Sequence, residues 1–192
     1  MTSSLSIWIS GAGFALVHSL TASNPFKSWI YQRAIRPSSY RLFYTLVSIV
    51  LTAVWAWYLH QLPDTPLYQL DGFFWFVCVV LQLLGAGVAL AAFYPMDGLV
   101  FLGFRAAQKE LDPFVISGIY RWIRHPMYSG AMLILLAMPE QTWNGLQFAL
   151  LVSLYFVIGS KLEEGRMLKE HPDYADYQKS VPSFIPCLSK RI

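Results

Sequence analysis

The sequence predicts an all-α integral membrane protein with about five transmembrane helices. Of its 192 residues, 56% are hydrophobic and only 13% are charged, whereas a soluble domain of this length carries about a quarter charged residues. The apolar residues also come in blocks. A helix that crosses a bilayer needs roughly 20 mostly apolar residues, and the blocks approach this length.

Five apolar blocks follow one another along the chain. They cover Leu5–Leu20, Tyr40–Leu62, Phe73–Phe93, Met127–Met138 and Trp143–Gly159. We group the first three as an N-terminal three-helix membrane region, residues 1–95, and the last two with the polar tail as a C-terminal region, residues 96–192, of one integrated domain. The first block has no basic segment before it, so we interpret it as a span and not as a cleavable signal peptide.

The 14 basic residues lie in alternate segments of the chain. They gather after the first block, between the third and fourth blocks and after the fifth, whereas the N-terminus and the other loops carry none. Basic residues favour the cytoplasmic side of a membrane. We therefore predict an external N-terminus and a cytoplasmic C-terminus, in the inner or plasma membrane if the protein is bacterial. The net charge of +3 reflects this topology and gives no reason to expect a nucleic-acid partner.

The fourth block is too short to cross a bilayer. Met127–Met138 has 12 residues, which make about 18 Å of helix against a hydrocarbon core of about 30 Å. Residues before it must supply the missing length, which places Tyr120–Pro126 at or below the membrane boundary. Irregular backbone at that depth is tolerated only where protein covers it or where it lines a cavity. The sequence therefore predicts a cofactor pocket at the cytoplasmic ends of the fourth and fifth helices.

The stretch GIYRWIRHPMYSG, Gly118–Gly130, carries the candidate chemistry. Pro126 can begin a helix but cannot continue one, and it pushes His125 toward extended geometry. We therefore expect a bent approach to the fourth helix, with backbone groups left free for a ligand. Arg124, His125 and Tyr128 are interpreted as functional, because ionisable groups in a membrane generally are.

Three glycines predict close contacts between backbones. Gly130 lies in the first turn after the proline, where a missing side chain lets another backbone approach. Gly85 and Gly87 in the third block predict close packing of helices.

Two adjacent acids, Glu163 and Glu164, follow the fifth block on a helix that we expect to continue out of the membrane. Neighbouring residues on a helix point roughly 100° apart. We therefore expect only one of them to face the Arg-His-Pro segment. The alternative is a solvated helix face on which both acids pair with nearby Lys and Arg.

The stretch Gly118–Gly130, followed by a helical hairpin and then by LEE and DYADYQKSVPSFIP, resembles the isoprenylcysteine carboxyl methyltransferase and phospholipid methyltransferase superfamily. The resemblance covers about Gly118–Pro186. Within that superfamily, AMPEQTWNGLQFAL and LEEGRMLKE are most similar to the methanethiol S-methyltransferase branch. The N-terminal segments HSLTASNPFK and YRLFYTLVS are similar to that branch and to the related NnrU proteins.

The resemblance implies that the protein binds S-adenosylmethionine as its cofactor. Carried over residue by residue, the family's cofactor ligands are Tyr120, His125, Pro126, Met127, Tyr128 and Glu163. This cofactor has a carboxylate, an ammonium, a sulfonium and a ribose diol, which cations, acids and aromatic faces can recognise. The catalytic residues that we predict are Arg124, His125 and Glu163.

The predicted function is a membrane methyltransferase that uses S-adenosylmethionine and acts on a small thiol or on a lipid-like or prenyl acceptor. A thiol titrates near pH 8.5 and needs little general-base help, which His125 or Glu163 could give. Prenylcysteine enzymes have a substrate-binding Arg where this chain has Ile158, with Lys161 as the nearby cation. This difference argues against a prenylcysteine carboxylate. The other expected partners are membrane lipids.

Two alternatives stay open. Sterol reductases, which use a nicotinamide cofactor, share a similar R-H-P-x-Y region, but they usually have Asn where Met127 stands. The other alternative is a non-catalytic NnrU-like membrane protein, in which His18 could bind haem or a metal. No second His lies at ligand spacing on that span, so we predict no metal site and interpret His18 as a residue that is bonded within the helix bundle or lines the pocket.

Overall fold

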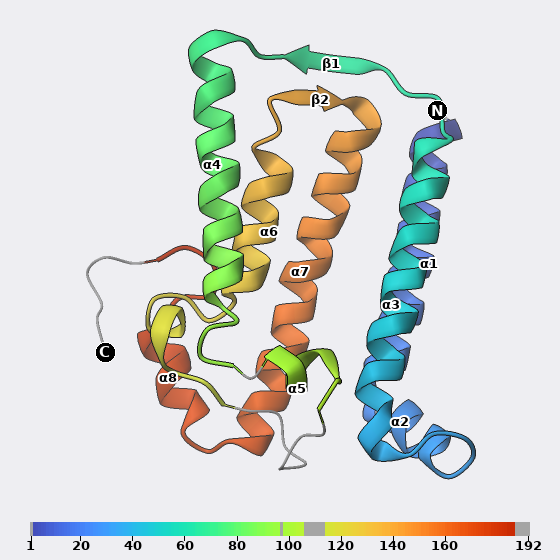
Figure 1. Cartoon of the computed structure of the whole chain (residues 1–192), viewed down its shortest axis with the longest axis vertical. Helices are drawn as coiled ribbons and strands as arrows, with labels where there is room; N and C mark the ends of the chain where they lie inside the picture. Colours follow the sequence, from blue (N-terminus) through green and yellow to red (C-terminus); the bar gives the residue numbers. More distant parts are fainter. Residues whose placement is uncertain (1, 97, 106–113, 187–192) are drawn as a thin grey trace. The chain divides into compact units, whose positions relative to one another are not determined.

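The computed structural model describes residues 2–96, 98–105 and 114–186, which are mostly helical (Figure 1). The chain forms two compact units. Unit 1 comprises Met1–Thr65 and Asp97–Glu110, and unit 2 comprises Pro66–Met96 and Leu111–Ile192. The third apolar block therefore groups with the fourth and fifth. One integrated domain with regions divided near residue 95 stays a prediction.

Unit 1 is built from two long helices and two short ones. These are α1 (Thr2–Ala22), α2 (Asn24–Tyr31), α3 (Pro37–His60) and α5 (Gly98–Leu102). α1 packs against α3, and the hydroxyl of buried Tyr40 in α3 donates to the carbonyl of Thr21 in α1. The hydroxyl of Tyr44 lies 2.9 Å from Nε2 of His18. The prediction that His18 is bonded within the bundle is confirmed.

Unit 2 is a layer of three helices with a small sheet at one end. Its elements are β1 (Pro66–Gln69), α4 (Gly72–Ala91), the 3₁₀ helix η1 (Gly118–Arg121), α6 (Pro126–Leu136), β2 (Glu140–Thr142), α7 (Trp143–Glu170) and α8 (Tyr174–Ser180). α6 packs on α4 and on α7, and the three helices run between the β1–β2 pair and the end that carries α8 (Figure 1).

The β1–β2 pair departs from the all-α prediction. The two strands are antiparallel, with Gln69 opposite Glu140. They come from the two polar loops that follow α3 and α6. Within unit 2, β1 precedes α4 and β2 follows α6, so the two strands lie at the same end of these two helices and their backbone N–H and C=O groups can satisfy one another.

The contact between α4 and α6 depends on two glycines. A Cβ atom on Gly130 would lie 2.3 Å from the carbonyl oxygen of Gly85 and 2.7 Å from the backbone nitrogen of Ala89. A Cβ atom on Gly85 would lie 2.7 Å from the carbonyl oxygen of Gly130. The close approach predicted at Gly85 and Gly130 is confirmed. Gly87 has open space beside it and takes no part in this contact.

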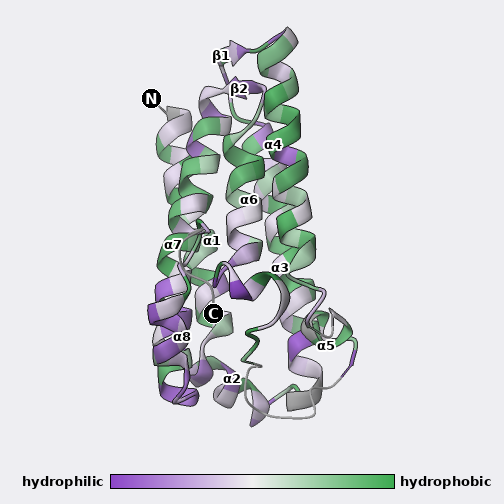
Figure 2. Ribbon diagram, turned by 90° about the vertical axis from the view of Figure 1, so that its left-hand side faces the viewer, coloured by the Kyte–Doolittle hydropathy of each residue, from purple (hydrophilic) through white to green (hydrophobic). Residues whose placement is uncertain are grey.

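Four of the described helices are long and apolar enough to cross a membrane, over Ser3–Ala22, Ser39–His60, Gly72–Ala91 and Trp143–Glu170. Figure 2 shows the apolar colouring along these helices and the polar residues gathered on α8 and on the adjoining end of α7. An integral membrane protein is thereby supported. α6 has 11 residues, which make about 16 Å of helix, so a fifth crossing and the sides on which the termini lie stay predictions.

Candidate active site

The candidate site is built where the chain approaches α6. Gly118 opens η1 with φ of 60°, a value that favours glycine. His125 has φ of −124° and ψ of 62°, and Pro126 then begins α6, because the first helical residue needs no backbone N–H and a proline fixes the right φ. The predicted bent approach to the fourth helix is confirmed, but the extended geometry expected of His125 is wrong, because its ψ of 62° lies outside the extended range.

A segment of the tail, Pro182–Phe184, lies against this bend; we call it the tail strap. The backbone N–H of Arg124 donates to the carbonyl of Pro182 at 2.9 Å, and that of His125 donates to the carbonyl of Ser183 at 3.0 Å. The prediction that these backbone groups are left free for a ligand is therefore wrong for the two N–H donors. The chain satisfies them with its own tail.

Glu164 is the charged centre of the site and is only 2% exposed. Its Oε1 accepts hydrogen bonds from Nη2 and Nε of Arg124 at 2.7 and 3.0 Å. The same oxygen lies 3.0 Å from Nε2 of His125 and accepts from Oγ of Ser183 at 3.3 Å. Its other oxygen accepts from the side chain of Gln178 at 3.0 Å. The alternative of a solvated acidic face is therefore wrong for Glu164.

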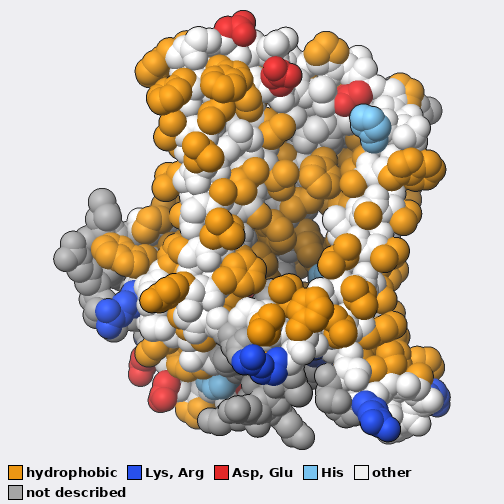
Figure 3. All heavy atoms as spheres, in the orientation of Figure 1, with side chains coloured by type: hydrophobic (Ala, Val, Ile, Leu, Met, Phe, Trp, Pro, Cys, Tyr) orange, Lys and Arg blue, Asp and Glu red, His pale blue; other side chains and the backbone are white. Residues whose placement is uncertain are grey.

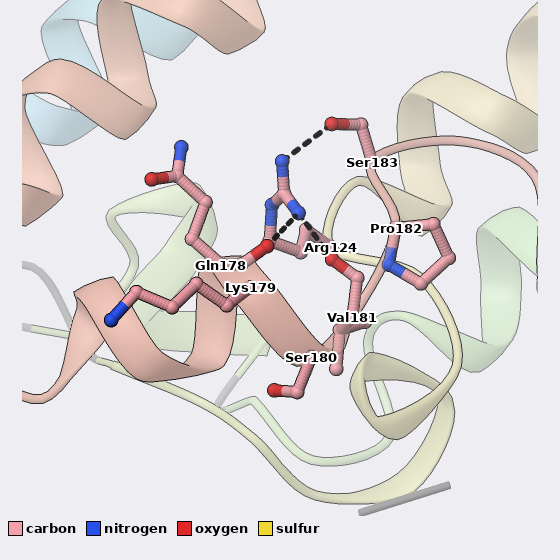
Figure 4. A pocket seen from close by; sticks show the side chains of 7 residues that line it. All are labelled: Arg124, Gln178, Lys179, Ser180, Val181, Pro182 and Ser183. Atoms are coloured by element: carbon pink, nitrogen blue, oxygen red, sulfur yellow. Dashed lines mark hydrogen bonds between the residues drawn. The ribbon is translucent and has the colours of Figure 1, made fainter. Parts of the chain in front are cut away.

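The guanidinium of Arg124 uses all its donors within the protein. Besides Glu164 it donates to Oγ of Ser183 at 2.6 Å, to the carbonyl of Gln178 at 2.9 Å and to the carbonyl of Val181 (Figure 4). These bonds occupy the five N–H groups that an arginine carries. The catalytic role of Arg124 stays a prediction, and a direct contact with a ligand would have to replace one of these bonds.

Glu163 contacts another part of the same segment. The hydroxyl of Tyr128 donates to Oε2 of Glu163 at 3.2 Å, and Nδ1 of His125 lies 3.8 Å from that oxygen. The Glu163 side chain is 40% exposed. The expectation that only one acid would reach the Arg-His-Pro segment is wrong. Arg124 and His125, in the bend before α6, meet Glu164, whereas the first turn of α6 carries Tyr128 to the neighbouring face of α7, where Glu163 lies.

Stacked rings adjoin the Glu163 carboxylate. The rings of His125 and Tyr128 are nearly parallel, with centroids 5.5 Å apart, and Tyr128 stacks in turn on Phe156 at 4.8 Å. Phe184 of the tail strap lies against His125 at 5.7 Å. No sequence pattern marks Phe156, which lies about two helical turns before Glu163 on α7. A carboxylate beside aromatic faces is suited to hold an organic cation.

The remaining predicted ligands lie around this cluster. The hydroxyl of Tyr120 contacts the sulfur of Met96 at 3.7 Å, and its carbonyl accepts from Tyr177 at 2.7 Å. Burial, and secondly the charge of Glu163, raise the pKa of Tyr120 to about 12. Its hydroxyl is therefore neutral at physiological pH. Pro126 is buried and Met127 is half-buried in the first turn of α6.

A pocket of about 350 Å³ opens beside Arg124, lined by Gln178, Lys179, Ser180, Val181, Pro182 and Ser183 (Figure 4). None of the predicted cofactor ligands lines it, so a cofactor pocket at the ends of α6 and α7 stays a prediction. Within the described ranges, no three His, Cys, Asp or Glu side chains are placed so that they could hold a metal ion.

Comparison with known proteins decides the family. A family model described as NnrU protein matches residues 7–167. The chain belongs to the NnrU family. Curated relatives bear the name methanethiol S-methyltransferase. One from Pseudomonas deceptionensis is 32% identical over 92% of this chain and 70% of its own length. A second, methanethiol S-methyltransferase 2 from Bradyrhizobium diazoefficiens, is 29% identical over 93% of this chain and 71% of its own length. No solved structure matches the chain.

The resemblance to the methanethiol S-methyltransferase and NnrU branch is thereby confirmed, and these relatives support the prediction that this member of the NnrU family is a methyltransferase enzyme. The match to the relatives covers most of the chain, so it includes both units and not only the Arg-His-Pro segment. The individual site residues stay predictions.

Proposed function

We propose that the protein is a membrane-embedded S-methyltransferase that takes a methyl group from S-adenosylmethionine and places it on the sulfur of a small thiol. The names of its relatives support methyl transfer to a thiol. The structural observation that carries the proposal is the partly exposed carboxylate of Glu163 beside the stacked rings of His125, Tyr128 and Phe156.

The residues present fit this methyl donor. Its sulfonium and ammonium are cations, which the Glu163 carboxylate and the aromatic faces can hold. Arg121 and Lys161 are exposed cations near the same end of unit 2 that could meet its carboxylate. When bound, S-adenosylmethionine supplies an electrophilic methyl group. Tyr120, Pro126 and Met127 would complete the binding site as the family resemblance implies.

Glu164 acts in this proposal through His125. Because its carboxylate can only accept a hydrogen bond, the 3.0 Å contact assigns the hydrogen to Nε2 when the His125 ring carries a single proton. Nδ1 then has a free lone pair, and it lies on the side of the ring where Glu163 is 3.8 Å away. An imidazole held in this tautomer can accept a proton at Nδ1.

The two acids also suit the charge that His125 would gain. His125 takes the proton that the thiol loses when its sulfur is methylated. The imidazolium would then have Glu164 beside Nε2 and Glu163 beside Nδ1, and both carboxylates stabilise its positive charge. Glu163 is the more exposed of the two acids and offers the proton a route back to water.

A small thiol suits this site better than a prenylcysteine. Ile158, at the position where the prenylcysteine enzymes have a substrate-binding Arg, is exposed on α7 and carries no charge to pair with a carboxylate. A thiol acceptor needs no such cation, because it presents only its sulfur and an apolar group.

The test uses the full chain, purified in detergent, with methanethiol and S-adenosylmethionine whose transferable methyl group is deuterated. Gas chromatography with mass spectrometry should detect dimethyl sulfide that carries one labelled methyl group. Label that appears in a lipid from a membrane extract, but not in dimethyl sulfide, would change the acceptor class. A folded protein that binds no S-adenosylmethionine and labels no acceptor would contradict the proposal and favour a non-catalytic role.

A further inference from the structure

The charged side chains in the first segment of unit 1, residues 1–63, are all positive. Residues 1–63 contain no Asp or Glu, and the first acid of the chain is Asp64. The basic residues of this stretch are Lys27, Arg33, Arg36 and Arg41. Lys27 lies in α2, Arg33 and Arg36 lie between α2 and α3, and Arg41 lies near the start of α3. Positive charge is therefore concentrated at one end of the α1–α3 pair.

The flanking helices determine where this charge lies. The candidate span of α1 ends at Ala22, and that of α3 begins at Ser39. The eight-residue helix α2 lies between them and starts where Ser23 accepts a hydrogen bond from the backbone of Phe26 at 3.4 Å. A short helix that joins two spans at the same end of both lies in the interface, where lipid headgroups are found.

The exposed side chains in α2 and just after it include an indole and two guanidinium groups, which are kinds of side chain found at a membrane interface. Trp29 is 51% exposed, whereas its neighbour Ile30 is buried. The guanidinium of Arg33 lies over the Trp29 ring, 4.8 Å from the centroid, and donates to the Trp29 carbonyl at 3.3 Å. Arg36 is exposed before the first turn of α3. Figure 3 shows Lys and Arg atoms next to hydrophobic atoms at this end of unit 1.

We propose that Asn24–Arg36 forms a binding surface for the phosphate headgroup of an anionic membrane lipid. Arg33 and Arg36 supply planar donors that match phosphate oxygens. Trp29 supplies an amphipathic ring of the kind that settles at headgroup level. The occupant is a lipid and not a soluble anion, because α2 joins the ends of two candidate membrane spans and presents an exposed indole beside its charges. This surface is independent of methyl transfer and of the site on unit 2.

Native mass spectrometry of the full chain in detergent tests the surface. The probes are phosphatidylglycerol and phosphatidylcholine with the same acyl chains. We expect the wild type to retain phosphatidylglycerol in preference to phosphatidylcholine. The variant Arg33→Gln/Arg36→Gln should bind phosphatidylglycerol more weakly, by roughly fivefold for each charge removed. Arg33→Lys should lose less than this double variant, because it keeps the charge and loses only the planar donors.

The matched control removes the same charge from unit 2. Lys169 and Lys179 are exposed there, and Lys179 pairs with Asp176 at 2.9 Å, so Lys169→Gln/Lys179→Gln should change lipid retention less than about twofold, well under the loss of even one interfacial charge. Equal retention of the two lipids by the wild type, or equal losses in the two double variants, would overturn the proposal. Displacement of phosphatidylglycerol by inorganic phosphate at the same concentration would also overturn it, since the site would then bind a soluble anion.

Discussion

Arg124 and Glu164 form a buried ion pair in which two guanidinium nitrogens share one carboxylate oxygen. Nη2 and Nε of Arg124 lie 2.7 and 3.0 Å from Oε1 of Glu164, and the two side chains are 7% and 3% exposed. The pair joins the approach to α6 with α7, and through Ser183 it holds the tail strap as well. Breaking such a pair is costly, because the remaining charge stays buried without its partner.

Glu164→Gln should therefore destabilise the protein by about 3 kcal/mol, since it leaves the Arg124 guanidinium uncompensated. Thermal unfolding of the purified protein in detergent measures the change. The double variant Arg124→Met/Glu164→Leu should recover part of the loss, because it leaves no unpaired charge. An unchanged unfolding temperature in Glu164→Gln would show that the pair contributes nothing to the fold.

Glu163→Gln should behave differently from Glu164→Gln. We expect at least about tenfold weaker binding of S-adenosylmethionine. The bound cofactor would cover the partly exposed carboxylate, and removing one partner of a charge pair desolvated in this way costs about 2–5 kcal/mol, where each 1.4 kcal/mol is about tenfold. The unfolding temperature should change little, since the Glu163 side chain is 40% exposed. Isothermal titration of the folded variant measures the affinity. Tyr128→Phe, which keeps the ring and removes the donor to Glu163, is the matched variant. Wild-type affinity in Glu163→Gln would remove this acid from the cofactor site.

Local rules explain what could be predicted of the fold and the site. A proline fixes its own φ and restricts the residue before it, so the bend at His125 and the start of α6 at Pro126 follow from two adjacent residues. Likewise, Gly130 near the start of an apolar helix predicts a close backbone neighbour, and the structure shows one in α4. Apolar length alone also predicted the four long helices.

Contacts between distant residues explain what could not be predicted. Which of the two acids is buried depends on where the tail strap and Gln178 lie, and no spacing within α7 reveals that. The pairing of β1 with β2 joins the segment before α4 to the segment after α6, which are far apart in the sequence. For the same reason the sequence predicts Arg124 as a ligand-binding cation, although its donors contact Glu164, Ser183 and the backbone carbonyls of Gln178 and Val181.

Gly130→Ala should disrupt the packing of α4 on α6. The added Cβ would lie 2.3 and 2.7 Å from backbone atoms of Gly85 and Ala89, and backbone cannot move aside as a flexible side chain can. Overpacking of this kind costs about 1–3 kcal/mol or more. Gly87→Ala in the same helix pair is the matched control, because its Cβ would meet nothing within 4 Å and alanine favours a helix by roughly 0.5–1 kcal/mol over glycine. Similar unfolding temperatures for the two variants would contradict the close contact.

Alkaline pH should lower the folding stability of the polar end of unit 2. Burial raises the pKa of Tyr120 and of Tyr174 from 10.0 to about 12, and also raises the pKa of Tyr177. The folded state thus keeps phenolic protons that the unfolded state loses near pH 10. Their contribution to stability is complete below pH 10 and is lost as the pH rises through about 12.

Ultraviolet titration of the phenolates, together with the denaturation midpoint at each pH, measures this effect. Part of the absorbance change from the 11 tyrosines should appear only as the pH rises from 10 toward about 12, in the same range as the fall in stability. Tyr174→Phe should remove a part of this change. Ionisation of all the tyrosines in one step near pH 10, with the structure intact, would contradict the burial of these hydroxyls.

His125→Gln should slow methylation of an alkyl thiol by about 100-fold or more, which is the usual contribution of a positioned general base. The imidazole is replaced by an amide that can still reach toward Glu164 but cannot accept a proton. An aromatic thiol, which is far more acidic, is largely ionised before it meets the enzyme and needs no base. The factor by which His125→Gln slows methylation should therefore fall as the thiol becomes more acidic.

Rates for a series of thiols of increasing acidity, measured with the wild type and with His125→Gln at saturating S-adenosylmethionine, test this role. Phe156→Leu is a suitable comparison, because it disturbs the ring stack on Tyr128 and leaves the His125 imidazole in place. Phe156→Leu should slow the methylation of every thiol by the same factor, since a packing defect does not depend on the proton of the acceptor. If the factor for His125→Gln is equally constant across the series, His125 orients the site or binds the cofactor and does not take the proton. Glu163, whose carboxylate is the more exposed of the two acids, would then be the group to test as the base.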